Sequence, residues 1–357
     1  MKILGIETSC DETAAAVVVD GQEILSNVVV SQIDIFAEYG GVIPEVAARS
    51  HLEVMMPVVD KALADAGCSW EDIDAIAVTH APGLLGSLLI GTLTARTLAI
   101  LHNKPLYAVH HLKSHVYANW LSSDLREFPR NANSEWGPEF PLIAMVISGG
   151  HTQILYMSGH NHFEIIGTTQ DDAVGECFDK VAKILGLPYP GGPSIAKAAA
   201  SGDSNKYKLP HPKVPGLNFS FSGLKTAVLR AVQKEVGVPI SYPSHKLAEL
   251  LSAQQVADFA ASFQKTAVEI LLEKVKMALL EHPEVRSVVF AGGVSANKVL
   301  RGAAANKLSG VKVFFPVPKL SGDNGAMVAA ACFYEIESGV RPVDPYKLNI
   351  YPRIAIG

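Results

Sequence analysis

Residues 2–31, KILGIETSCDETAAAVVVDGQEILSNVVVS, decide the fold of this 357-residue chain. Runs rich in β-branched residues and alanine are broken by a short polar turn and by Asp20-Gly21, which is the pattern of consecutive antiparallel strands. The pattern returns at 141–169, PLIAMVISGGHTQILYMSGHNHFEIIGTT, with a Ser-Gly-Gly turn at 148–150. The sequence therefore predicts two hairpin-rich units of the same kind.

Each unit is followed by a helical region, a buried strand, a glycine-containing turn and another helix. In the first half the strand and turn are DAIAVTHAPG (74–83), which leads to SLLIGTLTARTLAIL (87–101). In the second half RSVVFAGGVSANKVLRGAAANKL (286–308) contains all three parts. We therefore expect an α/β fold of two duplicated lobes, in the actin-like ATPase (ASKHA, RNase H-like) architecture that sugar kinases and the Hsp70 ATPase share. The two hairpin turns should face each other across a central cleft.

The expected boundary between the lobes lies in SSDLREFPRNANSEWGPE (122–139), which is polar, contains two prolines and lacks apolar periodicity. The division is then an N-terminal actin-like lobe at 1–121, a linker or insertion at 122–139 and a C-terminal actin-like lobe at 140–324. A C-terminal helix and tail at 325–357 are apolar enough to pack back on the N-terminal lobe.

Composition indicates a cytoplasmic protein without a membrane span. Although 48% of the residues are hydrophobic, no window approaches the ~20 uninterrupted apolar residues that cross a bilayer. The four cysteines are scattered and form no C-x-x-C pair, so we expect reduced thiols.

The formal net charge of −5 excludes a general polyanion binder held by its overall field. Contact with a nucleic acid therefore needs a local basic patch, a partner or both. One candidate patch is NKYKLPHPK (205–213) together with Lys225 and Arg230, and a solvated loop is the alternative interpretation.

Three histidines lie close together in VHHLKSHVYA (109–118). On a helix, His111 and His115 share one face, a workable spacing for one metal ion. The zinc-protease pattern H-E-x-x-H needs a Glu after the first His, where this chain has Leu112. A metal without a hydrolytic base is one interpretation, and a polar helix face or a buried core histidine is the other. Asp323 is either the N-cap of the last helix or a third ligand in a two-His, one-carboxylate set, which favours Fe(II) or Zn(II).

Two glycine-rich turns, ISGGHTQ (147–153) and AGGVSAN (291–297), are suited to a polar or anionic ligand. Paired glycines let backbone N–H groups approach phosphate oxygens closely. In the second turn we expect Ser295 to cap the following helix and Asn297 to lie in its first turn, and a helix N-terminus attracts anions.

An acidic turn, ETSCDET (7–13), joins the first two predicted strands. In a kinase or ATPase, Asp11 or Glu12 would hold Mg²⁺ or orient a nucleophile, and an ordinary acidic turn is the alternative. In the second half, Asp179 falls in a predicted helix, and YPGGP (189–193) reads as another turn of close approach.

A set of ordered motifs resembles one family. The motifs are GIETSCDET, GGVIPEVAARSH, HHLKSH, ISGGHTQ, GECFDK, YPGGP, FSFSGLKTAV, AGGVSAN and SGDNGAM. Together they closely resemble the TsaD family, the tRNA threonylcarbamoyladenosine transferases formerly described as O-sialoglycoprotein endopeptidases. The likeness runs over essentially the whole chain and looks most like the bacterial or organellar branch.

The resemblance implies an enzyme that transfers the threonylcarbamoyl group from threonylcarbamoyl-AMP to N6 of the adenosine 3′ of the anticodon in tRNAs reading ANN codons, with release of AMP. It also implies an inactive TsaB-type paralogue that dimerises with the chain and a TsaE-type P-loop ATPase. The alternative from the residues alone is a small-molecule kinase or ATPase of the actin-like fold, which leaves the histidine pair without a role. A metalloprotease lacks its base, and a non-catalytic scaffold is the third class.

The resemblance also assigns residues. One divalent metal, most often iron in the family and with Zn²⁺ or Mg²⁺ as the other candidates, would be held by His111, His115 and Asp323. The acidic turn would lie near the reacting centre, with Asp11 favoured over Glu12. The adenylate would contact Ile147, Ser148, Gly149, Gly150, His151, Asp179, Gly192 and Asn297.

Two positions depart from the family pattern. Ser114 stands where relatives commonly have Gly, and a hydroxyl is small enough to preserve the helix. Ala196 stands where many relatives have an acidic residue, so one contact to the substrate ribose is expected to be missing or supplied from elsewhere.

Overall fold

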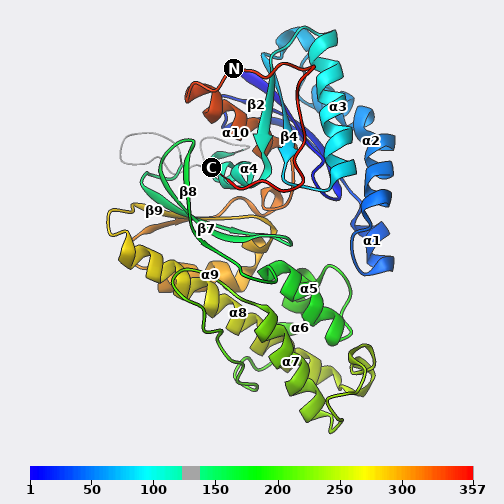
Figure 1. Cartoon of the computed structure of the whole chain (residues 1–357), viewed down its shortest axis with the longest axis vertical. Coiled ribbons are helices and arrows are strands. Elements are labelled where there is room, and N and C mark those ends of the chain that lie inside the picture. Colours follow the sequence, from blue (N-terminus) through cyan, green and yellow to red (C-terminus); the bar gives the residue numbers. More distant parts are fainter. Residues whose placement is uncertain (123–136, 357) are drawn as a thin grey trace.

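The computed structural model describes residues 1–122 and 137–356, which are built around two five-stranded mixed sheets (Figure 1). The first sheet has the order β3-β2-β1-β4-β5 and the second the order β10-β9-β6-β7-β8. The strands are β1 Lys2–Glu7, β2 Glu12–Val19, β3 Glu23–Ser31, β4 Ala75–Ala81, β5 Leu106–His110, β6 Leu142–Ile147, β7 Thr152–Gly159, β8 His162–Thr168, β9 Ser287–Ala291 and β10 Lys312–Phe314.

The two sheets have the same topology. Each begins with three antiparallel strands joined by tight turns, and each continues with two strands parallel to the first one. The first hairpin ends with Glu7 opposite Ala14, and the second with Ile147 opposite Thr152. The predicted duplication of an α/β unit is therefore confirmed.

Helices cover both sheets (Figure 1). Their bounds are α1 Ile33–Tyr39, α2 Pro44–Asp65, α3 Leu85–Leu101, α4 His111–Tyr117, α5 Val174–Ile184, α6 Gly191–Ala199, α7 Ser222–Glu235, α8 Ala253–Glu281, α9 Lys298–Lys307 and α10 Gly325–Glu337. The helices α2 and α3 pack on one face of the first sheet. A larger group of helices, α5, α6, α7, α8 and α9, packs with the second sheet. No helix in the described ranges is long and apolar enough to cross a membrane.

A shared core joins the two lobes. The helices α4 and α10 lie between the sheets, and apolar residues of both sheets pack in one cluster with them. Val18 and Val109 of the first sheet and Val146 of the second belong to this cluster and are fully buried. The helix α10 packs mainly against β1, β2 and α4, so the end of the chain returns to the N-terminal lobe.

The contact between α10 and β1 is a direct approach of two backbones. A Cβ atom built on Gly5 would lie 2.2 Å from the carbonyl oxygen of Gly325, and one built on Gly325 would lie 2.6 Å from the backbone nitrogen of Ala16. No side chain fits between them, and this places the residues just before α10 beside the carboxyl end of β1.

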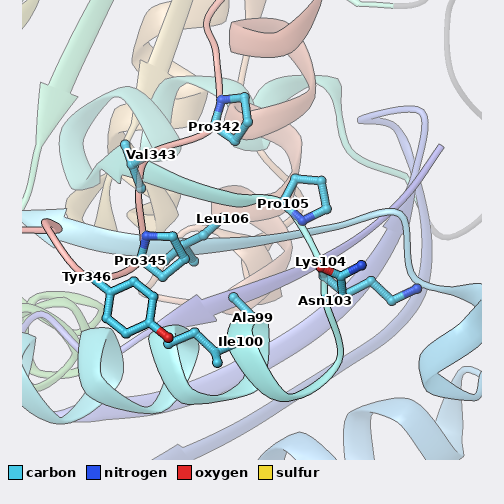
Figure 2. Close-up of a pocket in the computed structure, with 10 residues that line it drawn as sticks. All are labelled: Ala99, Ile100, Asn103, Lys104, Pro105, Leu106, Pro342, Val343, Pro345 and Tyr346. Carbon is cyan, nitrogen blue, oxygen red and sulfur yellow. The ribbon is translucent and has the colours of Figure 1, made fainter.

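The tail that follows α10 runs back over the first sheet and is tied to it by backbone atoms. Val343 N donates to Leu106 O at 2.8 Å, and Tyr351 N donates to His80 O at 3.0 Å. A cavity of about 460 Å³ lies between the tail and the end of α3, and Figure 2 shows Pro345 and Tyr346 of the tail beside it.

The linker expected at 122–139 falls mostly outside the described residues. At its described ends, Ser122 forms a parallel bridge with Glu23, and Glu139 N donates to Ser287 Oγ at 2.9 Å.

The first prediction concerns the α10–β1 contact. We expect Gly5→Ala to lower the free energy of unfolding by about 3 kcal/mol, because the methyl group would overlap a backbone oxygen that cannot rotate away. Gly41→Ala is the matched control, since a Cβ atom there meets nothing within 4 Å. Urea unfolding of both variants checks this, and equal stabilities would contradict the close approach.

The second prediction concerns Glu335 on α10. Burial raises the pKa of its carboxyl to about 7, and the charge of Lys113 offsets only part of that effect. In the unfolded chain the carboxyl ionises near the ordinary value of 4.5, so between pH 5 and 7 the unfolded state binds fewer protons and stability falls as pH rises. Relative to Glu335→Gln, the wild type should lose about 2 kcal/mol over this window. Denaturant titrations of both proteins at several pH values measure this difference, and parallel curves would contradict it.

Candidate metal centre and substrate turns

The two histidines lie on α4 as expected, directly after β5. His110 ends the strand, and its Nδ1 accepts a hydrogen bond from Leu112 N, which caps the helix. One turn separates His111 from His115, their ring centroids are 4.6 Å apart, and both side chains are buried. Ser114 between them is fully buried and donates to His110 O at 3.3 Å, so the departure at this position leaves the helix intact.

Asp323 lies beside both histidines. Its Oδ1 is 3.1 Å from His115 Nε2 and 3.6 Å from His111 Nε2, and one ligand atom from each of the three residues falls within 4.8 Å of the others. The capping role is taken by its neighbour, because Asn324 Oδ1 accepts from Met327 N at the start of α10. Asp323 therefore keeps its carboxylate for the histidines.

The electrostatics of this group favour a cation. Burial alone would lower the pKa of His111, but the carboxylates of Asp323 and Glu7 outweigh it and raise that pKa to about 9. Burial alone would raise the pKa of Asp323, but His111 and His115 lower it to about 2. His111 is therefore protonated at neutral pH, so the group holds a positive charge even without a metal ion.

The hydrogen bonding of the buried side chains also fits a metal site. His115 is 1% exposed, its Nδ1 has no hydrogen-bond partner within the described part of the chain, and its Nε2 has only the carboxylate of Asp323 beside it. A buried polar atom without a partner is costly, and a metal ion would supply that partner. Two imidazoles and one carboxylate suit Fe(II) or Zn(II) and leave coordination positions open.

The surroundings of His111 are completed by three residues for which the sequence predicts no role, Glu7, Ser9 and Thr79. His111 Nδ1 lies 3.1 Å from Ser9 Oγ and 3.2 Å from Glu7 Oε2, and Thr79 Oγ1 donates to the same carboxylate. The available signal was a charged residue at the end of an otherwise apolar strand, KILGIE.

The acidic turn lies close to this centre. Glu12 opens β2, and burial, followed by the charges of Asp323 and Asp11, raises its pKa to about 10. Ser31 Oγ donates to Glu12 Oε1 at 3.1 Å. Burial first, and then the charge of Asp11, raises the pKa of Tyr189 in the YPGGP turn. Asp11 thus acts on groups from both lobes.

The first glycine turn of the second lobe, from Ile147 to His151, faces the histidines. Burial and the charges of His111 and His115 lower the pKa of His151 to about 4. Gly149 and Gly150 are exposed, and a Cβ atom on either would meet nothing within 4 Å. Ser148 N donates to His151 O at 2.9 Å and closes the turn.

The other expected contacts with the adenylate lie on α5, α6 and α9. Asp179 Oδ1 accepts from Gly191 N at 2.7 Å, and a Cβ atom on Gly192 would meet nothing within 4 Å. Ala196 lies one turn further along α6.

The expected cap of α9 was wrong. Asn297, and not Ser295, caps the helix, since Asn297 Oδ1 accepts from Val299 N and Leu300 N. A short 3₁₀ turn, Gly293–Ala296, follows the glycines and delays the helix. Ser295 is buried in that turn.

Three side chains of the candidate basic patch have side-chain partners in the structure. Lys225 pairs with Asp172 at 3.4 Å, Arg230 donates to Gln233 Oε1, and His211 of the 205–213 stretch pairs with Glu273 on α8. The side chains of Lys225, Arg230 and His211 are therefore held by partners within the second lobe.

A family model described as "TsaD: tRNA N6-adenosine threonylcarbamoyltransferase" matches residues 23–330. The chain belongs to the TsaD family. Two relatives with the name tRNA N6-adenosine threonylcarbamoyltransferase illustrate the match. The protein of Symbiobacterium thermophilum is 49% identical over 358 residues, 99% of this chain and 97% of the relative. That of Bacillus subtilis is 43% identical over 365 residues, 100% of this chain and 96% of the relative.

Solved structures resemble this TsaD-family chain in fold alone. HypF of T. kodakarensis matches with a TM-score of 0.60 at 14% identity, over 94% of this chain and 48% of that one. A full-length HypF in a phosphate- and nucleotide-bound form matches with a TM-score of 0.54 at 14% identity, over 94% and 46%. This agrees with the actin-like fold expected from the duplicated hairpins.

The third prediction tests the metal centre of this TsaD-family protein. Because the pKa of His111 is raised to about 9, a metal must displace a proton, and apparent affinity should rise about tenfold per pH unit between pH 6 and 9. Competition between the full chain and a chelator for Zn²⁺ at several pH values measures this slope. His115→Ala should abolish high-affinity binding, whereas His162→Gln, an exposed histidine on β8, should leave it unchanged. A flat pH profile would contradict displacement of that proton.

Proposed function

We propose that this chain transfers the threonylcarbamoyl group from threonylcarbamoyl-AMP to N6 of the adenosine 3′ of the anticodon in tRNAs reading ANN codons. The observation that carries the proposal is the membership of the TsaD family along nearly the whole chain, at 43–49% identity to named transferases. The convergence of a His-His-Asp group with turns from both lobes is consistent with it.

His111, His115 and Asp323 would hold one divalent metal, and Fe²⁺ is the proposed ion. When bound, the metal would supply a Lewis acid and a template for the phosphate and threonyl groups of the substrate. No glutamate follows His111 to serve as the base of a zinc protease, so this centre suits group transfer rather than peptide hydrolysis.

The glycine turns would bind the adenylate. Gly149, Gly150 and Gly192 face open space, so their backbone N–H groups are approachable by phosphate or ribose oxygens. The side chain of Asp179 accepts from Gly191 N and that of Asn297 from Val299 N, so both are held in place and would form fixed walls of the pocket. Ile147, Ser148 and His151 complete the proposed contact set.

Asp11 is assigned to the reacting centre. The attacking N6 amine forms a bond to the carbamoyl carbon, the bond from that carbon to the phosphate oxygen breaks, and AMP leaves. Burial, followed by the charges of Asp323 and Asp11, raises the pKa of Glu12 and favours its protonated form, which makes it a poor acceptor for the proton that the amine loses. Asp11 is therefore the better candidate of the two.

We also propose that an inactive TsaB-type paralogue docks on an apolar face of α2 and α3. Leu52 and Met56 on α2 and Leu85, Leu89 and Leu93 on α3 are exposed, and the leucines of α3 repeat every four residues. Such a row on one helix face marks a protein interface. With a net charge of −5, the chain would rely on this partner and on a TsaE-type ATPase for tRNA capture in the cytoplasm.

The fourth prediction is a reconstitution. Purified chain, its partners, unmodified tRNA and threonylcarbamoyl-AMP made in situ are combined, and the modified nucleoside is scored by mass spectrometry. We expect modification by the wild type and a loss of at least about 100-fold in His111→Ala and Asp11→Asn, because each removes a group placed at the reacting centre. Glu38→Gln, an exposed change on α1, is the control. ATP consumption with a phosphorylated metabolite and no modified tRNA would favour the kinase alternative.

A further inference from the structure

We propose that Glu7 is a positioning residue that fixes His111 in the tautomer carrying its proton on Nδ1, which leaves Nε2 free to bind a metal. This inference rests on the metal centre in the proposed function. It concerns a residue that touches neither the substrate nor the metal and acts through His111.

Glu7 lies on the opposite side of His111 from Asp323. It is the last residue of β1 and is fully buried. Its Oε2 is 3.2 Å from His111 Nδ1, whereas Asp323 Oδ1 is 3.6 Å from Nε2 of the same ring. The imidazole is therefore held between two carboxylates, one at each nitrogen.

The carboxylate of Glu7 is itself held in place. Its Oε1 accepts from Ser9 N at 2.5 Å, and its Oε2 accepts from Thr79 Oγ1 at 2.5 Å. These donors come from the turn after β1 and from β4, two fixed parts of the first sheet. A carboxylate held at both oxygens presents a fixed acceptor to the imidazole.

The charge of Glu7 decides the position of the proton on His111. An ionised carboxylate only accepts hydrogen bonds, so a ring nitrogen 3.2 Å away must carry the hydrogen. Ser9 Oγ, 3.1 Å from the same nitrogen, can accept as well and does not change this assignment. Both oxygens of Glu7 already accept, Oε1 from Ser9 N and Oε2 from Thr79 Oγ1, which is the pattern of an ionised carboxylate. A buried carboxylate also requires such a partner, because an unpaired one would be very costly.

The two histidines consequently differ in how they are oriented. The ring of His115 contacts a carboxylate at one nitrogen only, where Nε2 lies 3.1 Å from Asp323 Oδ1, and its Nδ1 has no partner within the described residues. His111 is fixed by a chain of hydrogen bonds that reaches into two strands. A carboxylate on the outer nitrogen of a ligating histidine also makes its inner nitrogen more basic.

The fifth prediction tests Glu7 through metal binding, using Co²⁺ as a spectroscopic probe on the full chain. Glu7→Gln should weaken Co²⁺ binding by about 10- to 100-fold. An amide NH₂ can donate to Nδ1 and so favours the tautomer with its proton on Nε2. Nitrogen-detected NMR of the zinc-loaded protein should show a proton on Nδ1 of His111 in the wild type. Glu335→Gln is the matched control, because it neutralises a buried carboxyl that faces Lys113 instead of the histidines.

Two further variants keep the test decisive if Glu7→Gln fails to fold. Thr79→Val removes one donor to Glu7 while keeping side-chain volume, and should weaken Co²⁺ binding several-fold. Glu7→Asp keeps the charge on a shorter arm and should bind more tightly than Glu7→Gln. Wild-type affinity in both Glu7→Gln and Thr79→Val, or a proton on Nε2 of His111 in the wild type, would overturn the proposal.

The outcome is separable from that of the proposed function. If the wild type binds Co²⁺ and Glu7→Gln weakens it, the role of Glu7 stands even if no tRNA is modified. If the wild type modifies tRNA but binds no metal, the role of Glu7 is overturned and the transferase assignment stands.

Discussion

The close approach of α10 to β1 is the constraint on which the centre depends. With only backbone atoms between Gly5 and Gly325, the loop before α10 can reach the carboxyl end of β1. Asp323 lies two residues before Gly325 in the sequence, and Glu7 lies two residues after Gly5. Backbone packing therefore fixes the separation of the two segments, hydrogen bonds from Ser9 N and Thr79 Oγ1 hold the carboxylate of Glu7, and His111 lies between the two carboxylates.

In this geometry, oppositely charged side chains lie close enough to balance one another although they are buried. Glu7 and Asp323 are carboxylates with lowered pKa values beside His111, whose pKa is raised. Protonation of His111 partly balances the two negative charges when no metal is bound, and a metal would take over that role at Nε2. Glu7, His111 and His115 are buried beside the shared core of α4, α10 and both sheets, and this burial strengthens their interactions.

Sequence patterns predicted the duplicated fold because strand alternation and glycine turns are local signals, and both hairpins carry them. The spacing of His111 and His115 likewise predicted their shared helix face. Asp323 lies more than two hundred residues away, so spacing could not place it beside the histidines. Ligand chemistry left it as either an N-cap or a third ligand, and the resemblance to a family favoured the second interpretation. Glu7 was missed because its function depends on Thr79 and His111, which only the assembled sheet brings together. The cap of α9 was misplaced because a 3₁₀ turn and an α-helix begin with similar residues.

The residues of the candidate centre are widely spaced along the sequence, and this spacing has a consequence for biosynthesis. Its parts come from residue 7, residues 111 and 115, and residue 323 of 357. The tail then reaches back to the histidine helix, where Ile354 O contacts His110 Nε2 at 3.4 Å. A ribosome releases these parts one after another, and domains fold as their segments emerge. The full set of proposed ligands would thus exist only after residue 323 has been made. Loading with the proposed metal would then follow synthesis of most of the described fold, and chains that stop before residue 323 would carry the histidine pair without the carboxylate.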